Sequence, residues 1–192
     1  MHDSMLMPAL FQRLDPDSRL TVLDLGAASG ETVAAFSEFK CRLNFVDLLG
    51  ELSCEDLAED ADPIALKEKF RGLVGEAEVD VLLLWDVLNY LPVPALEAFD
   101  ACLQPLLGAQ TQVHGISVRS PNTSLDWVHY GLHGESKIGV QARSGEALPS
   151  TPNPPSVLNS TLTVLRVQRG ILLRDGRLEV SLGLVPTEAE AA

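Results

Sequence analysis

The chain has 192 residues, of which 46% are hydrophobic, and 27 acidic against 14 basic residues give it a net charge of −13. This length suits one domain with a sizeable buried core, and the acidic excess argues against nucleic acid as a partner because it repels phosphates. The three cysteines form no Cys-x-x-Cys pair, which argues against disulfides and a zinc site. No apolar run approaches the roughly 18 residues of a membrane span, and no signal-peptide pattern is present. We therefore expect a cytoplasmic protein.

The first 118 residues alternate between helix and strand patterns. Apolar residues recur with a helical period over residues 4–14, and Asp62 followed by Pro63 is a good start for a helix that runs to residue 73. Residues 79–85 are apolar on both faces, as expected of a central parallel strand. The other expected elements are strands over residues 19–25, 41–47 and 111–118 and helices over 31–39 and 94–103. A further strand between residues 47 and 79 is very short or missing.

The last third of the chain follows a different pattern. Residues 119–160 are rich in Ser, Gly, Pro and Asn, and we expect a long loop there. Asp175-Gly176 lies between two apolar runs, 162–173 and 177–185, which is a strong signal for a β-hairpin. The whole order predicts an α/β fold, a Rossmann-like three-layer sandwich whose mostly parallel sheet is closed by an antiparallel C-terminal hairpin. We expect one domain over residues 1–186 and a flexible acidic tail over 187–192.

The segment Val22-Leu-Asp-Leu-Gly-Ala-Ala-Ser-Gly30 joins the first expected strand to a helix. Glycines at such a turn let the backbone bend sharply and approach a ligand, and doubly wound sheets bind ligands in the crevice above it. This strand–turn–helix segment resembles the first motif of the class I S-adenosylmethionine-dependent methyltransferases. Asp24, Gly26 and Gly30 match that motif, whereas Ala28 replaces its middle glycine.

The resemblance implies S-adenosyl-L-methionine as the cofactor. Asp24 would then hold its ammonium group, and the free N–H groups of residues 30–33 would face its carboxylate. Ala27 and Ala28 would line the turn. Other glycine loops fit less well, because the spacing Gly-x-x-x-Gly is not the Gly-x-Gly-x-x-Gly of nicotinamide sites, and Glu31 stands where a nucleotide triphosphate loop has lysine.

Two further segments complete the expected cofactor site. Asp47 ends the second strand, where a carboxylate can accept hydrogen bonds from ribose hydroxyls, and Leu48 could cover the adenine. Asp86 and Val87 follow the central strand and, by the resemblance, border both cofactor and acceptor. Asn89 and Tyr90 would then face the acceptor, and the acidic residue usual beside the adenine amino group is Asp60, Asp62 or neither.

The acceptor and the catalytic residues stay open at this stage. We expect methyl transfer to a small molecule or, as a second choice, to a protein side chain. His129 and His133 are the candidate bases for an oxygen acceptor, whereas His114 lies within a strand and is expected to pack locally. Trp127, Tyr130 and Lys137 are candidates to line the acceptor pocket, and residues 152–156 are expected to form a loop. The oligomeric state is open.

Two other functions were weighed against this one. A methyltransferase-like protein without catalysis, acting as a binding partner or scaffold, is favoured by the missing glycine and by the lack of an evident base. A nicotinamide-dependent oxidoreductase predicts the other loop spacing. Binding of S-adenosylmethionine separates these possibilities.

Overall fold

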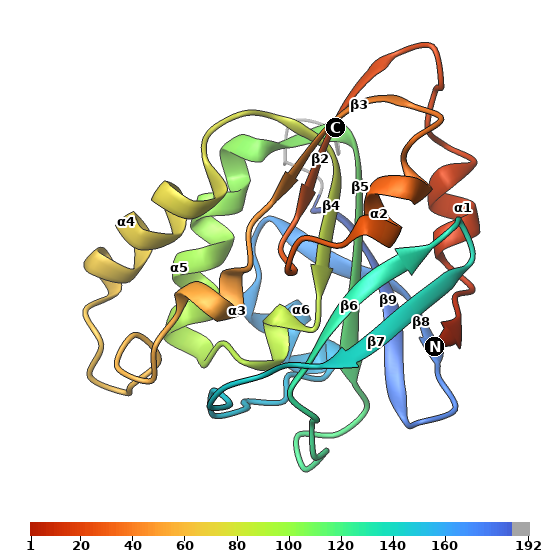
Figure 1. Cartoon of the computed structure of the whole chain (residues 1–192). Helices are drawn as coiled ribbons and strands as arrows, with labels where there is room; N and C mark the ends of the chain where they lie inside the picture. The colour runs from red at the N-terminus through yellow and green to blue at the C-terminus, as the bar shows by residue number, and fades with distance from the viewer. Residues whose placement is uncertain (186–192) are drawn as a thin grey trace.

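The computed structural model describes residues 1–185 and contains a six-stranded sheet in the order β3-β2-β4-β5-β9-β8. The strands β3, β2, β4 and β5 run parallel, and β9 is antiparallel to both β5 and β8. These six strands span Arg19–Asp24 (β2), Lys40–Phe45 (β3), Val79–Trp85 (β4), Leu107–Val118 (β5), Leu165–Leu172 (β8) and Arg177–Leu184 (β9). The central strands of this order are β4 and β5, which lie side by side in Figure 1. The predicted closing hairpin is confirmed, with β9 inserted between β5 and β8.

Short helices connect the strands. They span Met7–Phe11 (α1), Gly30–Ala35 (α2), Leu48–Glu51 (α3), Pro63–Val74 (α4), Val93–Leu103 (α5) and Pro155–Thr161 (α6), with 3-10 turns at Val87–Asn89 and Gln104–Leu106. The predicted start of α4 is confirmed, because the Asp62 side chain accepts a hydrogen bond from the Ile64 N–H and Pro63 is the first helical residue. Among the described residues no strand lies between β3 and β4, which agrees with the weak strand signal between residues 47 and 79.

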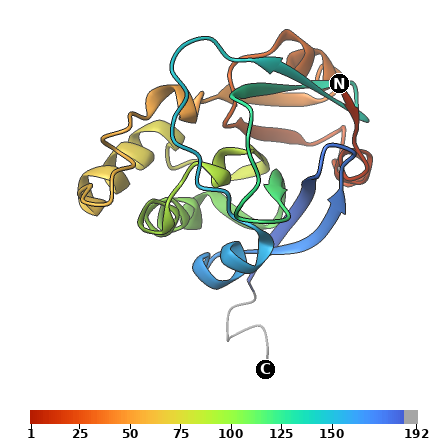
Figure 2. The same cartoon turned by 90° about the horizontal axis from the view of Figure 1, so that it is seen from below.

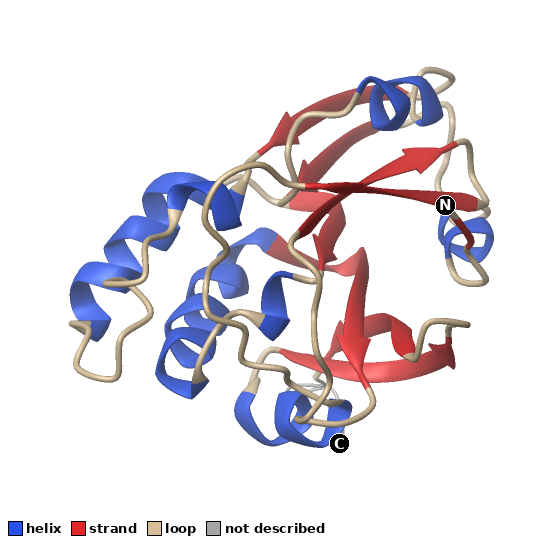
Figure 3. Ribbon diagram, turned by 60° about the horizontal axis from the view of Figure 1, so that its bottom comes forward, coloured by secondary structure: helices blue, strands red, loops and turns tan. Residues whose placement is uncertain are grey.

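Side chains of β4 alternate between two hydrophobic cores, one on each face of the sheet. Leu82 and Leu84 pack against α4, α5 and α6, where Phe70 and Phe99 meet edge to face. Val81, Leu83 and Trp85 face the other core, which contains α1, α2 and the strands β6 and β7. Figure 3 shows α4 and α5 on one side of the sheet and the elements of the second core, α1, α2, β6 and β7, on the other side. The three-layer sandwich predicted from the sequence is therefore confirmed.

The prediction of a loop over residues 119–160 is wrong. This segment contains β6, Val128–His133, and β7, Lys137–Ala142, which pair as an antiparallel hairpin, followed by α6. Strand β7 also pairs with β1, His2–Asp3, so that a separate three-stranded sheet forms in the order β1-β7-β6. The segment expected as a loop at residues 152–156 instead leads into α6, which begins at Pro155. Residues 128–142, here called the covering hairpin, pass in front of β5, β9 and β8 in Figure 1 and lie away from α4 and α5 in Figure 2.

The N-terminal segment is attached to β9 by a buried polar cluster around Glu179. The Glu179 carboxylate accepts hydrogen bonds from the Ser4 hydroxyl, the Met5 N–H at 2.9 Å and the Leu6 N–H at 3.3 Å, and it contacts His114 Nε2 at 2.9 Å. His114 is 1% exposed, so the expectation that it packs locally is confirmed. None of the described helices is both long and apolar enough to cross a membrane.

Candidate functional site

Three carboxylates lie at the carboxyl edge of three adjacent strands. Asp24 is the last residue of β2, Asp47 follows β3 by two residues, and Asp86 directly follows β4. Strand β2 pairs with β3 on one side and with β4 on the other, so the chain crosses the sheet in opposite directions from this point. Open α/β sheets bind ligands at such a switch point. The fold therefore brings together the three carboxylates that the sequence analysis selected.

Asp24 is fully buried, and its two oxygens differ in their surroundings. Its Oδ1 accepts hydrogen bonds from the Gly26 N–H at 2.8 Å and from the Trp85 indole Nε1–H at 2.5 Å. Its Oδ2 is buried without a hydrogen-bond partner. Burial raises the pKa of Asp24 to about 7, although the hydrogen bonds from Gly26 and Trp85 act in the opposite direction. This carboxyl therefore changes charge near neutral pH.

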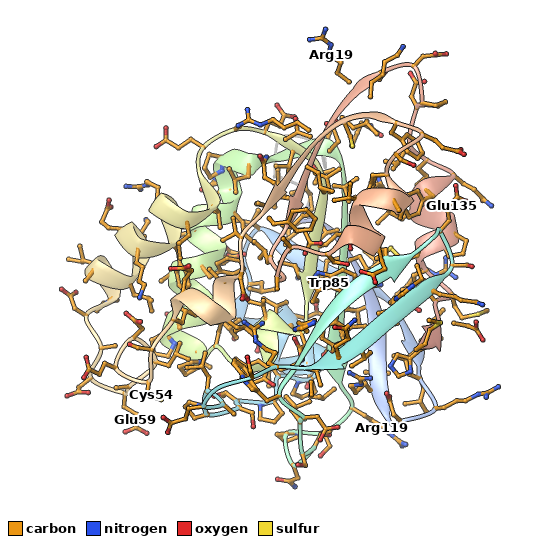
Figure 4. The ribbon with its side chains drawn as sticks, viewed as in Figure 1. Arg19, Cys54, Glu59, Trp85, Arg119 and Glu135 are labelled. Carbon is orange, nitrogen blue, oxygen red and sulfur yellow. The ribbon has the colours of Figure 1, made fainter. Side chains whose placement is uncertain are left out.

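The Trp85 side chain fills the space above Gly26. A Cβ atom at Gly26 would lie 2.8 Å from Trp85 Cδ1 and 2.9 Å from Nε1, which explains why this position needs glycine. The indole stacks on the Tyr130 ring of β6, with centroids 5.5 Å apart and an interplanar angle of 7°. Trp85 has a φ of 48°, a left-handed conformation that is strained for an aromatic residue. In Figure 4, Trp85 lies near the centre of the molecule, beside β6.

Asp47 forms an ion pair with Arg143, the residue that directly follows the covering hairpin. Both Asp47 oxygens accept hydrogen bonds from Arg143 Nη2, at 2.6 and 2.7 Å, and the carboxylate also caps α3 through the Gly50 N–H. The Arg143 guanidinium lies 4.7 Å from the centre of the Trp127 ring. The Arg143 side chain is 10% exposed and the Asp47 side chain is 35% exposed, so this ion pair is only partly shielded from water. The carboxylate that was predicted to bind ribose is thus hydrogen-bonded to Arg143 in this structure.

Asp86 belongs to a buried network that fixes Tyr130. The Tyr130 hydroxyl donates to Asp86 Oδ2 at 3.2 Å and accepts a hydrogen bond from Arg177 Nη1, while Arg177 Nη2 also binds Asp175 at 2.5 Å. Burial raises the pKa of Asp86 to about 7, although the hydrogen bond from Tyr130 lowers it. A cavity of about 80 Å³ is lined by Asp86, Tyr130, Asp126 and Arg177, among other residues. Asp86 is therefore a titratable group at a cavity wall, as general bases are.

The two histidines proposed as bases lie on β6, at a different cavity. His129 and His133 line a space of about 260 Å³ between the covering hairpin and the start of α2, together with Gly30 and Glu31. His129 Nε2 contacts Gln141 Oε1 at 3.1 Å. Helix α2 has only six residues, and the Ser29 hydroxyl accepts a hydrogen bond from the Thr32 N–H. The histidines therefore face the glycine turn and lie apart from Asp86.

The remaining predicted site residues divide between the turn and the core. Ala28 and Gly30 are exposed, and Ala27 is half-buried at the same turn. Leu48 and Val87, by contrast, are 0% and 2% exposed and belong to the core beside α4 and α5. Both are therefore packing residues in this conformation. Asn89 is also buried, and its amide donates to the Ile116 carbonyl at 2.8 Å.

Sequence reasoning selected Tyr130 as a pocket residue but missed its place on β6, and it missed Arg143 and Arg177 altogether. A signal for the first existed, because residues 128–133 alternate strictly between core-facing and outward-facing side chains, with Val128, Tyr130 and Leu132 buried. Such alternation indicates a strand. Arg143 and Arg177 gave no comparable signal, because their partners lie 96 and 47 positions away in the chain.

Comparisons with known proteins agree on the fold. No model of a known protein family and no curated protein sequence matches the chain. Among solved structures, the chain resembles the 1,6-didemethyltoxoflavin-N1-methyltransferase of Burkholderia thailandensis, a complex with S-adenosylhomocysteine (17% identity, TM-score 0.52, covering 95% of this chain and 78% of that one). It also resembles the mitomycin 7-O-methyltransferase MmcR (13% identity, TM-score 0.51, 94% and 54%) and CalO1, a methyltransferase in calicheamicin biosynthesis (13%, 0.50, 94% and 53%).

The chain has the fold of the class I S-adenosylmethionine-dependent methyltransferases, as the resemblance in the glycine turn implied. It spans only a little over half the length of MmcR and of CalO1. The polar groups at the crevice suit the methyl donor, because a buried Asp24 oxygen lacks a partner and the Asp47 carboxylate lies two residues after β3. The space between these groups is filled by Trp85 and Arg143 in the conformation described.

Proposed function

We propose that this chain is an S-adenosylmethionine-dependent methyltransferase whose acceptor is a small molecule. The observation that carries the proposal is the unpartnered, fully buried Oδ2 of Asp24 beside the glycine turn, at the edge where β3, β2 and β4 end in carboxylates. A buried carboxylate oxygen without a donor is costly, by about 1–3 kcal/mol. An ammonium group at this position would satisfy it.

The residues that would hold the donor are Asp24 for its ammonium, Asp47 for its ribose hydroxyls, and Gly26 with Asp86 at the crevice wall. When bound, S-adenosylmethionine supplies a methyl group that its sulfonium already activates, so the protein mainly has to align the acceptor and exclude water. The covering hairpin suits the second task, because it lies directly over the glycine turn.

Asp86 is the group that we propose as the base for a hydroxyl acceptor. Its pKa of about 7 leaves a fraction of it ionised at neutral pH, and it lines the small cavity next to Tyr130 and Arg177. His129 and His133 remain candidates for an acceptor that enters on the other side of Tyr130, through the larger cavity. The similar solved structures include methyltransferases named for 1,6-didemethyltoxoflavin and mitomycin, which supports a small molecule over a protein side chain.

Titration calorimetry with S-adenosylhomocysteine tests the proposal. We expect saturable binding at or below millimolar concentrations by the wild type. Asp24→Ala should weaken or abolish that binding, whereas Asp17→Ala, at an exposed carboxylate before β2 and outside the site, should leave it unchanged. Transfer of labelled methyl from S-adenosylmethionine to fractions of a metabolite extract would then identify the acceptor. A lack of binding at millimolar ligand both by the folded wild type and by folded variants that empty the crevice refutes the proposal.

A second function is favoured by a specific observation, the filled crevice. If Trp85 and Arg143 never leave Asp24 and Asp47, the chain cannot bind the donor, and a methyltransferase-like protein without catalysis that binds a partner becomes the better account. This alternative predicts no binding of S-adenosylhomocysteine by the wild type or by variants that empty the crevice.

A further inference from the structure

We propose that Trp85 and Arg143 are a built-in competitor for the cofactor: they occupy Asp24 and Asp47, so that closure of the crevice and binding of an adenosine-bearing amino acid exclude one another. This inference rests on the proposed function and adds its regulation. The crevice would open when the covering hairpin moves away from the sheet, and ligand affinity would be set by how firmly the hairpin closes.

Trp85 takes the contacts expected of the amino-acid part of the ligand. Its indole N–H donates to Asp24 Oδ1 at 2.5 Å, and its ring lies where a Cβ on Gly26 would collide with it. The ring is 1% exposed and belongs to the core on the hairpin side of the sheet. A ligand that uses Asp24 and the glycine turn must therefore displace this side chain.

Arg143 takes the contacts expected of the ribose. Its Nη2 lies 2.6 and 2.7 Å from the two Asp47 oxygens, and its guanidinium covers the face of Trp127. Trp127 in turn meets Tyr90 edge to face at 5.4 Å. The Arg143 guanidinium takes acceptor positions on both Asp47 oxygens, so ribose hydroxyls that bind Asp47 must compete with it. The two halves of the expected ligand site are thus closed by two different side chains of the same chain.

The covering hairpin connects the two closures. Tyr130, whose ring stacks on Trp85, lies on β6, and Arg143 follows the end of β7 by one residue. Among the described strands, the hairpin pairs only with the two residues of β1 and forms no ladder with the six-stranded sheet. It packs on the sheet through side chains and binds α2 through the Leu132 N–H, which donates to Thr32 Oγ1 at 3.0 Å. Such a unit can move without unpairing the central strands.

The closed crevice retains unfavourable features that opening or ligand binding would relieve. Trp85 keeps a left-handed φ of 48°. Asp24 Oδ2 and Trp127 Nε1 are both buried without a hydrogen-bond partner. Strain and unsatisfied polar groups of this kind gather where a structure has two states, because a ligand that supplies the missing partners gains free energy. All three features lie in the crevice.

The test compares the binding of S-adenosylhomocysteine by four proteins in titration calorimetry: wild type, Arg143→Ala, Trp85→Phe and Arg119→Ala. Arg119 is exposed at the edge of the molecule, away from Trp85 in Figure 4, and its removal makes the same change in net charge. We expect Arg143→Ala to bind about tenfold tighter or more than the wild type, because the apparent dissociation constant scales inversely with the open fraction. Arg119→Ala should match the wild type.

Trp85→Phe keeps an aromatic ring and removes the N–H that binds Asp24, so this variant should also bind S-adenosylhomocysteine more tightly than the wild type. It serves as the test variant if Arg143→Ala does not fold. Hydrogen exchange gives a second measurement. Saturating S-adenosylhomocysteine should speed exchange of the amides of residues 128–142 in the wild type, whereas a ligand that simply rigidifies the fold would slow it. The chain has two tryptophans: Trp85 binds Asp24, and Trp127 lies under Arg143. Their fluorescence should therefore also change on binding.

The outcomes separate the two proposals. Equal or weaker binding by Arg143→Ala and Trp85→Phe than by wild type overturns the competitor and leaves the proposed function standing. Slower hairpin exchange on binding does the same. If none of the four proteins binds, although Arg143→Ala is folded and its hairpin exchanges faster than in the wild type, the crevice opens but does not take this ligand, and the proposed function itself fails.

Discussion

Replacement of Asp24 by asparagine is the most direct probe of the buried crevice. The folded-state pKa of about 7 lies above the ordinary value of 3.8, because burial penalises the carboxylate. Between these two values the folded chain keeps a proton that the unfolded chain has lost, so stability is highest at low pH and falls as pH rises through this window. The full effect of three pKa units is about 4 kcal/mol, of which about 2–3 kcal/mol falls between pH 5 and pH 8.

Asparagine cannot ionise, and its amide oxygen can still accept from Gly26 and Trp85. We therefore expect the loss of unfolding free energy between pH 5 and pH 8 to be about 2–3 kcal/mol smaller in Asp24→Asn than in the wild type. Urea unfolding followed by circular dichroism at pH 5, 6, 7 and 8 measures this difference. Asp60→Asn, at an exposed carboxylate, is the matched control and should keep the wild-type slope.

The pH slope of the unfolding free energy shows whether Asp24 is buried as a neutral group. An Asp24→Asn variant with the same pH slope as the wild type would mean that Asp24 ionises in the folded chain as it does in water. The carboxylate would then be hydrated, and the crevice could not be closed by Trp85 as described. Asp86, whose pKa burial also raises to about 7, should contribute a second loss in the same pH window and would remain in the variant.

Two further substitutions test the framework around the site. Glu179→Ala should destabilise the fold by about 3 kcal/mol, because it leaves buried N–H groups and His114 without their acceptor; urea unfolding measures this, and a loss below about 1 kcal/mol would contradict it. Asn153→Ala removes two hydrogen bonds from the Asn153 amide, to the Leu88 and Leu91 carbonyls at 2.7 and 2.9 Å. We expect a loss of about 2 kcal/mol in thermal or urea unfolding, and an unchanged midpoint would show that water replaces the amide.

The first part of the fold could be predicted from the sequence because its signals are local. The apolar run of β4 was placed at its observed bounds, Val79–Trp85, since a strand covered on both faces is apolar throughout. Asp62-Pro63 and Asp175-Gly176 marked a helix start and a hairpin turn through preferences of single residues. The glycine turn after β2 marked, for the same reason, the edge of the sheet at which we propose that the ligand binds.

The state of that edge was decided only by tertiary contacts. Asp24, Asp47 and Asp86 were selected correctly as neighbours at one edge, but their partners Trp85, Arg143 and Tyr130 reach them from elsewhere in the chain, up to 96 positions away. A residue type and its spacing report which backbone element it prefers, since that preference comes from its own dihedral angles and near neighbours. Whether a carboxylate faces a cavity or another side chain depends on how separate layers pack, and here Trp85 of β4, Tyr130 of β6 and Arg143 decide it together.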